Sequence, residues 1–106
     1  MNEMKNFFPA IDEKELKDSS MKYVSVEGTP ILFIKQHGRI LAIDNRCPHQ
    51  GCGFSGGTLE EGAIVCPCHD WRFDLKTGEY EKAPTIKLTK YELEIKEGKI
   101  WVKLDD

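Results

Sequence analysis

Two short stretches, CPHQGC (residues 47–52) and CPCHDW (residues 66–71), decide how this chain is understood. The sequence has four cysteines and three histidines, and these two stretches hold all of them except His37. A small chain that gathers its thiols and imidazoles in two places is expected to bind a metal, form a disulfide or use a thiol as a nucleophile. The rest of the sequence favours a bound metal.

The composition is that of one small domain. The chain has 106 residues and a net charge of −3, with both signs interspersed. The sequence has no basic patch, so a nucleic-acid partner is not expected. No apolar run has the length of a signal peptide or of a membrane span. We therefore expect a cytoplasmic protein without a membrane anchor, and in that compartment clustered cysteines bind metals more often than they form a disulfide framework.

Apolar patterning predicts an all-β fold. Strands are expected at residues 21–27, 30–36, 39–45, 63–66, 72–75, 90–96 and 99–104. His37-Gly38 and Glu97-Gly98 have the composition of tight hairpin turns. Before the strands, Asp12 and Glu15 have capping-box spacing, which predicts one helical turn. Short strands at this spacing indicate a small antiparallel barrel or sandwich.

Residues 45–57 follow neither the strand nor the helix period. This segment contains four glycines within seven residues: Gly51, Gly53, Gly56 and Gly57. Glycine lets backbone N–H groups approach a bound anion or sulfur closely. The segment is therefore expected to be shaped around a bound group.

The ligand spacing is C-x-H, formed by Cys47 and His49, and then C-x-x-H, formed by Cys66 and His69. Two thiolates and two imidazoles suit either a tetrahedral zinc ion or an iron–sulfur cluster. Zinc fingers usually keep like ligands together and place the histidines on a helix, whereas here the pairs are mixed and no helix is expected. Mixed pairs suit two irons, one bound by the cysteines and one by the histidines, as in a Rieske [2Fe–2S] centre. Zinc remains the alternative.

At these residues the sequence resembles the Rieske family, through CPHQGCG (residues 47–53) and CPCHDWRFDLKTGE (residues 66–79). The resemblance covers most of the chain from about Met21 onward. It implies a Rieske fold over a single domain, residues 1–106, with stacked antiparallel β-sheets and a cluster-binding subdomain made of two loops, at about residues 45–57 and 66–73. It also implies that one [2Fe–2S] cluster is held by four residues, the inner iron by Cys47 and Cys66 and the outer iron by His49 and His69.

Four further residues are expected to support or cover the cluster, three of them because of the resemblance. In the Rieske subunits of cytochrome complexes, the positions of Cys52 and Cys68 are cysteines joined in a disulfide, which implies the same bond here. Two thiols that pack together are the alternative. Pro84 matches a proline-containing loop that covers the cluster in this family, and an ordinary turn residue is the alternative. Trp71 and Pro84 are both expected to shield the cluster from water, with a place in the core as the alternative for Trp71.

The second loop also carries information about the reduction potential. The cytochrome-complex pattern has hydroxyl side chains after the second histidine, whereas this sequence has Asp70, Trp71 and Phe73, as in oxygenase-linked ferredoxins. Hydrogen bonds to sulfur stabilise the reduced cluster, so their loss lowers the potential. We expect a value in the lower part of the Rieske range, which spans roughly −150 to +300 mV.

The expected function is that of a soluble one-electron carrier, which accepts electrons from a reductase and delivers them to a terminal oxygenase or another reductase. A small electron-transfer subunit of a larger reductase or oxygenase complex is the alternative. A self-sufficient oxygenase also needs a mononuclear iron held by two histidines and a carboxylate. With His49 and His69 committed, only His37 is left, so the chain is not expected to be an enzyme by itself. A zinc module used for binding is a third hypothesis.

Overall fold

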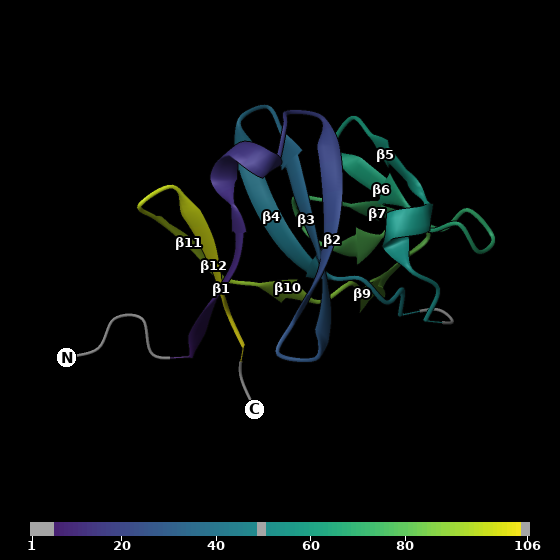
Figure 1. The fold of residues 1–106 in the computed structure, drawn as a ribbon. Helices are drawn as coiled ribbons and strands as arrows, with labels where there is room; N and C mark the ends of the chain where they lie inside the picture. The colour runs from purple at the N-terminus through teal and green to yellow at the C-terminus, as the bar shows by residue number, and fades with distance from the viewer. Residues whose placement is uncertain (1–5, 49–50, 105–106) are drawn as a thin grey trace.

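The computed structural model describes residues 6–48 and 51–104, and most of their regular structure is β-strand (Figure 1). The strands form three antiparallel sheets, of three, four and five strands. This architecture confirms the predicted all-β class. No helix among the described residues is long and apolar enough to cross a membrane.

The central sheet separates two hydrophobic cores. It consists of β2 (Ser20–Val26), β3 (Thr29–Gln36), β4 (Arg39–Asp44) and β10 (Lys90–Tyr91), in the order β10-β4-β3-β2. In β3, Leu32 and Ile34 belong to one core, while Ile31 and Phe33 belong to the other. Successive side chains of a strand point to opposite faces, so the unbroken apolar run of β3 reflects burial on both sides.

One face of the central sheet packs against the five-stranded sheet. The strands of this sheet follow each other in chain order: β5 (Thr58–Glu60), β6 (Ala63–Val65), β7 (Arg72–Asp74), β8 (Glu79–Tyr80) and β9 (Ala83–Lys87). The core between the two sheets contains Phe54 and Phe73 together with Cys47 and Cys66. Cys47 and Cys66 therefore lie on this side of the molecule.

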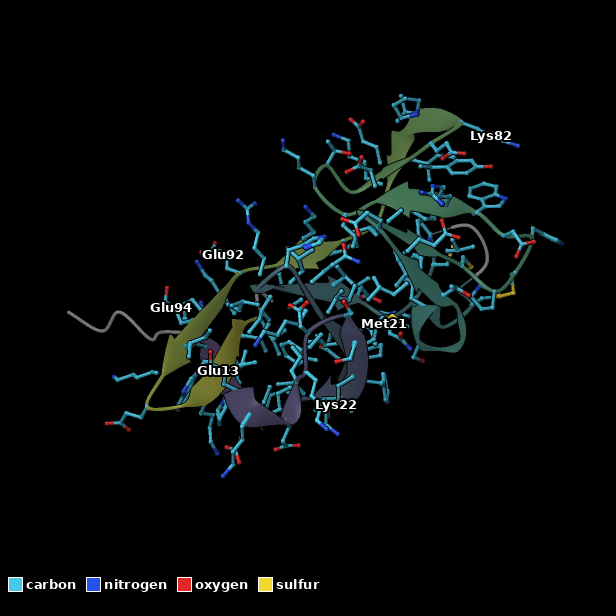
Figure 2. The ribbon with its side chains drawn as sticks, turned by 90° about the horizontal axis from the view of Figure 1, so that it is seen from above. Glu13, Met21, Lys22, Lys82, Glu92 and Glu94 are labelled. Carbon is cyan, nitrogen blue, oxygen red and sulfur yellow. A yellow bond between two sulfur atoms is a disulfide. The ribbon has the colours of Figure 1, made fainter. Side chains whose placement is uncertain are left out.

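The other face of the central sheet packs against the three-stranded sheet. This sheet consists of β1 (Phe7–Asp12), β11 (Leu93–Lys96) and β12 (Lys99–Lys103), in the order β1-β12-β11. Ile11, Ile100 and Val102 of this sheet belong to the second core, which lies between it and the central sheet. Figures 1 and 2 show this sheet and the five-stranded sheet on opposite sides of the molecule.

The predicted turns are confirmed. The turns His37-Gly38 and Glu97-Gly98 each place two consecutive residues at positive φ, between 54° and 77°, as tight two-residue hairpins require. The predicted helical turn is the 3-10 helix η1 (Glu13–Glu15), where a side-chain oxygen of Glu15 accepts a hydrogen bond from the backbone N–H of Asp12 at 3.2 Å.

Two expectations about the strands were wrong. Residues 90–96 do not form one strand, because β10 pairs with β4 while β11 pairs with β12. The chain crosses from the central sheet to the three-stranded sheet at Glu92, which lies between the two strands. The strands β1, β5, β8 and β9 were not expected. Of these, β1 contains Pro9 and an irregular register between Pro9 and Ile11, features that an edge strand tolerates.

Candidate iron–sulfur cluster site

The first loop begins where β4 ends, and the buried side chain of Asn45 organises it. The Oδ1 atom of Asn45 accepts a hydrogen bond from the backbone N–H of Ser55 at 2.8 Å, and its Nδ2 atom donates to the hydroxyl of Ser55 at 3.2 Å. The backbone carbonyl of Asn45 accepts from the N–H of Phe54 at 2.7 Å. A buried amide must have such partners, and these bonds bring residues 53–55 back against the start of the loop.

Backbone hydrogen bonds place Cys47 next to Cys52. The N–H of Cys47 donates to the carbonyl of Cys52 at 2.9 Å, and the N–H of Gly51 donates to the carbonyl of Cys47 at 2.7 Å. Gly51 has a φ of 75°, a conformation that glycine adopts without steric cost. The two cysteines of the first loop therefore belong to one closed turn.

The second loop joins β6 to β7 and contains Cys66, Cys68 and His69. It is closed by a hydrogen bond of 2.8 Å from the N–H of Cys66 to the carbonyl of Trp71. Within it, His69 and Asp70 adopt φ values of 66° and 54°. This left-handed conformation costs on the order of 1 kcal/mol per residue outside glycine, and such residues concentrate at functional sites.

The two loops are joined by the predicted disulfide. Cys52 and Cys68 are bonded through sulfur, with their Cα atoms 6.3 Å apart, and the bond is visible in Figure 2. In the unfolded chain the same bond would close a loop of 15 residues, which is worth roughly 3 kcal/mol in the chain-entropy picture. The structure therefore contains the disulfide and not two separate thiols.

The loops also meet through a close backbone approach. A Cβ atom added to Gly57 would lie 1.9 Å from the carbonyl oxygen of Val65, the residue before Cys66. No side chain fits at that distance, which explains why the first loop leaves toward β5 through a glycine. The neighbouring Gly56 is different, because its added Cβ would meet the ring of Pro67 at an ordinary 3.8 Å.

The two remaining cysteines are buried in one core. Cys47 and Cys66 take no part in the disulfide, and they are 2% and 0% exposed. Both belong to the core between the central and five-stranded sheets, and Cys52 and Cys68 pack against the same core. A buried pair of thiols on two covalently joined loops fits the sulfur-bound side of an iron–sulfur cluster.

The predicted histidine ligands are only partly placed. His69 is exposed on the second loop, which fits an outer ligand, whereas His49 lies outside the described residues. In residues 6–48 and 51–104, no group of three or more Cys, His, Asp or Glu side chains gathers closely enough to hold a metal ion. The structure thus brings Cys47 and Cys66 into one core, and the complete set of four ligands stays a prediction.

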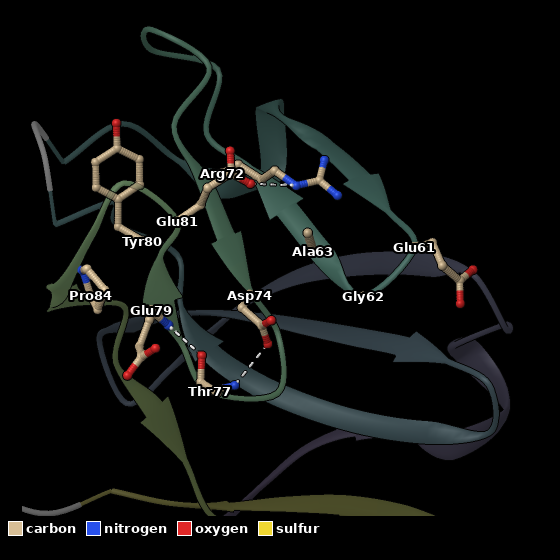
Figure 3. A pocket seen from close by; sticks show the side chains of 10 residues that line it. All are labelled: Glu61, Gly62, Ala63, Arg72, Asp74, Thr77, Glu79, Tyr80, Glu81 and Pro84. Atoms are coloured by element: carbon tan, nitrogen blue, oxygen red, sulfur yellow. Dashed lines mark hydrogen bonds and ion pairs between the residues drawn. The ribbon is translucent and has the colours of Figure 1, made fainter.

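Trp71 packs against the core that contains both buried cysteines. Its ring stacks on that of Tyr80, with centroids 3.9 Å apart and planes within 3°. Phe73 lies beside both rings at centroid distances of 6.4 and 5.6 Å. This arrangement suits the shielding role predicted for Trp71. The exposed Pro84 lines a pocket with Tyr80 (Figure 3), and its shielding role stays a prediction.

Next to His69 the surface carries a compact group of charges. The guanidinium of Arg72 forms ion pairs with Glu60 and, at 3.2 Å, with Glu81; Figure 3 shows the second of these. His69, Arg72 and Glu81 are among the residues that line a hollow of about 350 Å³. Most of the charge of Arg72 is therefore neutralised within the chain.

A second charged group holds the start of the first loop. The carboxylate of Asp44 accepts hydrogen bonds from the guanidinium of Arg46 at 2.9 and 2.7 Å, from the N–H of Arg46 at 2.9 Å and from the hydroxyl of Tyr91 at 2.9 Å. Burial raises the pKa of Asp44, but these hydrogen bonds outweigh it and hold the pKa below 3.8. Burial and the bond to Asp44 raise the pKa of Tyr91 to about 12.

Sequence reasoning missed Tyr91, Asn45 and Tyr80 as supports of the loops. Tyr91 and Asn45 act over distances that no local pattern reveals. Tyr80 did have a signal, because Thr77-Gly78 has the composition of a turn, which would bring residue 80 back to β7, and the structure pairs Tyr80 with Phe73.

Comparison with known proteins agrees with this site. Residues 6–92 match the family model of the Rieske [2Fe-2S] domain. The ferredoxin component of the naphthalene 1,2-dioxygenase system of Pseudomonas aeruginosa is 34% identical over 91 residues, which are 85% of this chain and 88% of that protein. The ferredoxin component of the alkene monooxygenase system of Xanthobacter autotrophicus is 30% identical over 94 residues, which are 88% of this chain and 75% of that protein.

Other relatives are much longer than this chain. Human apoptosis-inducing factor 3 is 31% identical over 91 residues, but the match spans 15% of its length.

Among solved structures, a chain in the complex of reduced oxygenase and oxidized ferredoxin in carbazole 1,9a-dioxygenase superposes with a TM-score of 0.82. It is 25% identical, and the match covers 92% of this chain and 93% of that one. The terminal oxygenase of carbazole 1,9a-dioxygenase from Novosphingobium sp. KA1 superposes with a TM-score of 0.87 at 20% identity, over 95% of this chain and 30% of that one, and shows the shared fold.

The resemblance first indicated by two cysteine–histidine loops is thus confirmed by a family match over most of the chain, by relatives of similar length and by the fold: this chain belongs to the Rieske [2Fe-2S] domain family.

Proposed function

We propose that the protein is a one-electron carrier that accepts electrons from a reductase and delivers them to a terminal oxygenase or another redox enzyme. The observation that carries this proposal is the pair of buried thiols, Cys47 and Cys66, on two loops joined by a disulfide. Support also comes from the two ferredoxin components, because the match spans 88% and 75% of their lengths.

In this proposal Cys47 and Cys66 hold one iron of a single [2Fe–2S] cluster, and His49 and His69 hold the other. When bound, such a cluster takes up and releases one electron at a time. The surrounding domain is residues 1–106, with the two loops at about residues 45–57 and 66–73. The cytoplasmic location predicted from the sequence is part of the proposal, and cell fractionation tests it.

The residues around the two cysteines exclude water and keep the loops in place. The cysteine side chains lie in an apolar core, and Trp71 is covered by Tyr80 on one ring face. The disulfide ties the first loop to the second, and Asn45 and Asp44 hold the start of the first loop. Loops that are held in this way need little rearrangement when an electron arrives or leaves.

The chain is proposed to carry electrons without catalysing a reaction itself. The third histidine, His37, lies in the turn between β3 and β4, where its imidazole pairs with Glu61 and is 66% exposed. It is therefore placed on a surface turn, and a mononuclear iron would need further ligands of the kind that oxygenases use. The alternative of a small subunit within a larger reductase or oxygenase complex uses the same site.

A redox titration followed by electron paramagnetic resonance tests the proposal. We expect two irons and two acid-labile sulfides per chain, a signal that develops on one-electron reduction, and a midpoint in the lower part of the range of roughly −150 to +300 mV. Cys66→Ser and His49→Ala should abolish the signal, while His37→Ala should retain it. A colourless protein that contains one zinc would overturn the proposal, and a midpoint well above zero would contradict the low potential.

A further inference from the structure

A groove of about 720 Å³ opens between the central sheet and the turn that follows β7. Its floor is aliphatic, formed by Ile34 of β3, Leu41 of β4 and Leu75 after β7. Ile34 and Leu75 also belong to the core that holds the two buried cysteines, and Leu41 packs against that core. The groove is therefore the open margin of the core.

The strand register places cations directly beside this aliphatic floor. Ile34 pairs with Leu41, and the next pair on the same face is Gln36 with Arg39. On the other side of β4, Lys90 pairs with Ile43 and so points to this face as well. Directly opposed residues and their neighbours two positions along share one face of a sheet, so the rim is basic as a consequence of the pairing.

The three cations that line the groove, Arg39, Lys76 and Lys90, form no ion pair with any described residue. The carboxylate of Asp74, which also lines the groove, is engaged by the turn after β7, because its Oδ1 atom accepts from the N–H groups of Lys76 and Thr77 at 2.7 and 3.1 Å. Figure 3 shows Asp74 bonded to Thr77. In a chain of net charge −3, these cations make the groove locally positive.

The groove lies at the end of the strands away from the cysteine loops. β4 begins at the groove with Arg39 and runs for five steps to Asp44, a distance of about 17 Å for an extended strand. β6 begins beside Gly62, which lines the groove, and ends at Val65 before Cys66. A molecule in the groove would therefore leave the exposed His69 accessible.

We propose that this groove binds an acidic segment of a partner protein, with one aliphatic side chain on the floor and its carboxylates against Arg39, Lys76 and Lys90. The open shape favours a chain segment, because small molecules prefer clefts that enclose most of their surface. This site goes beyond the proposed function. It lets one partner stay attached while another reaches the exposed edge of the second loop.

The test is an NMR titration of the isotope-labelled protein with a blocked peptide of alternating glutamates and leucines. Saturable shifts are expected at residues 34–41, 62, 74–76 and 90, and they should weaken at higher salt because the contacts are ionic. The double variant Arg39→Gln with Lys76→Gln should bind about tenfold more weakly, since two partly exposed ion pairs are lost. Lys90 is left unchanged in this variant because its Nζ atom donates a hydrogen bond to the carbonyl of Lys76 at 2.8 Å and so stabilises the turn.

The matched control is Lys14→Gln with Lys87→Gln, which removes the same charge from two exposed lysines elsewhere. It should bind as tightly as the unmodified protein. Equal binding by the double variant and the control would overturn the proposal, as would shifts centred on the cysteine loops. Tighter binding of octanoate than of the peptide would instead identify a small carboxylate as the ligand and also overturn it. The NMR titration measures binding and does not depend on electron transfer. It can therefore be interpreted even if the redox titration contradicts the proposed function.

Discussion

The hydroxyl of Tyr91 donates a hydrogen bond of 2.9 Å to the Oδ2 atom of Asp44, across 47 residues of sequence. Asp44 is the last residue of β4, and the same carboxylate receives the guanidinium and the N–H of Arg46 one residue before Cys47. The short strand β10 thus fixes the direction in which the chain enters the first cysteine loop. A residue that is distant in the sequence therefore supports the start of the first loop.

The substitution Tyr91→Phe removes this hydrogen bond and keeps the ring. Hydrogen bonds to charged groups contribute about 1.5 to 3 kcal/mol, and the remaining bonds from Arg46 limit the loss, so we expect the free energy of unfolding to fall by about 1 to 2 kcal/mol. Urea unfolding measures the difference. Tyr23→Phe, at an exposed tyrosine, is the control. An equal effect of the two substitutions would show that the Asp44 bond contributes nothing.

Acid should destabilise the protein through Asp44. Its pKa lies below 3.8 in the folded protein, so its contribution to stability is present above the unfolded value and is lost as the pH falls through the folded value. Unfolding free energies measured from pH 6 down to pH 2 should therefore decline less steeply in Asp44→Asn than in the unmodified protein.

Tyr91 should have the opposite effect in base. The pKa of its hydroxyl is about 12 in the folded protein, against an ordinary value of 10. The stability that Tyr91 contributes is therefore present below pH 10 and is lost as the pH rises toward 12.

Removal of the disulfide should weaken the joint between the loops. The double variant Cys52→Ser with Cys68→Ser is expected to lose roughly 3 kcal/mol of unfolding free energy. Thermal unfolding with and without dithiothreitol measures the loss. The reductant should lower the midpoint of the unmodified protein and leave that of the variant unchanged. A variant as stable as the unmodified protein would mean that the loops are held together by packing alone.

Gly57 and Gly56 make a matched pair. Gly57→Ala drives a Cβ atom toward the carbonyl oxygen of Val65, which lies 1.9 Å from its ideal position, and overpacking of this kind costs about 1 to 3 kcal/mol. Gly56→Ala meets only an ordinary contact and should change stability by less than about 1 kcal/mol. Calorimetry compares them. Equal stability of the two variants would contradict the close approach of the loops.

The stack of Trp71 on Tyr80 should protect the site from water. Tyr80→Ala uncovers one ring face and removes an aromatic contact worth about 0.5 to 1.5 kcal/mol beyond burial. The visible absorbance of protein loaded with iron and sulfide should bleach faster in the presence of a chelator. Tyr80→Phe retains the ring and should bleach at the unmodified rate. If both variants bleach at that rate, the stack does not limit access to the site.

The features that were predictable from sequence are those set by neighbouring residues. The hairpin turns at His37-Gly38 and Glu97-Gly98 need residues that accept positive φ, and the pattern shows them. The capping box of Asp12 spans three positions and was also visible. The disulfide between Cys52 and Cys68 was expected only from the family resemblance, because spacing alone does not determine which cysteines pair.

Several of the features that were missed depend on contacts between distant segments, although the short strands β5, β8 and β9 pair with strands that are adjacent in the sequence. The strand β1 owes its existence to pairing with β12, where Phe7 lies opposite Lys103, and its sequence contains a proline that argues locally against a strand. The division of residues 90–96 between two sheets follows from the packing of those sheets. The bond between Tyr91 and Asp44 has no sequence signal, since each residue alone reads as ordinary strand surface.

The pairing of β1 with β12 also has a practical consequence for attaching the protein to other materials. Phe7 and Lys103 sit side by side at the margin of the three-stranded sheet, and Figure 1 shows that sheet on the side opposite the disulfide-linked loops. An electrode linker or a fused protein joined at either of these strands would hold the molecule with its cysteine loops directed outward. Immobilisation through β12 should therefore preserve access to His69, whereas a linker on Lys82, which lines the same hollow as His69, would compete with it.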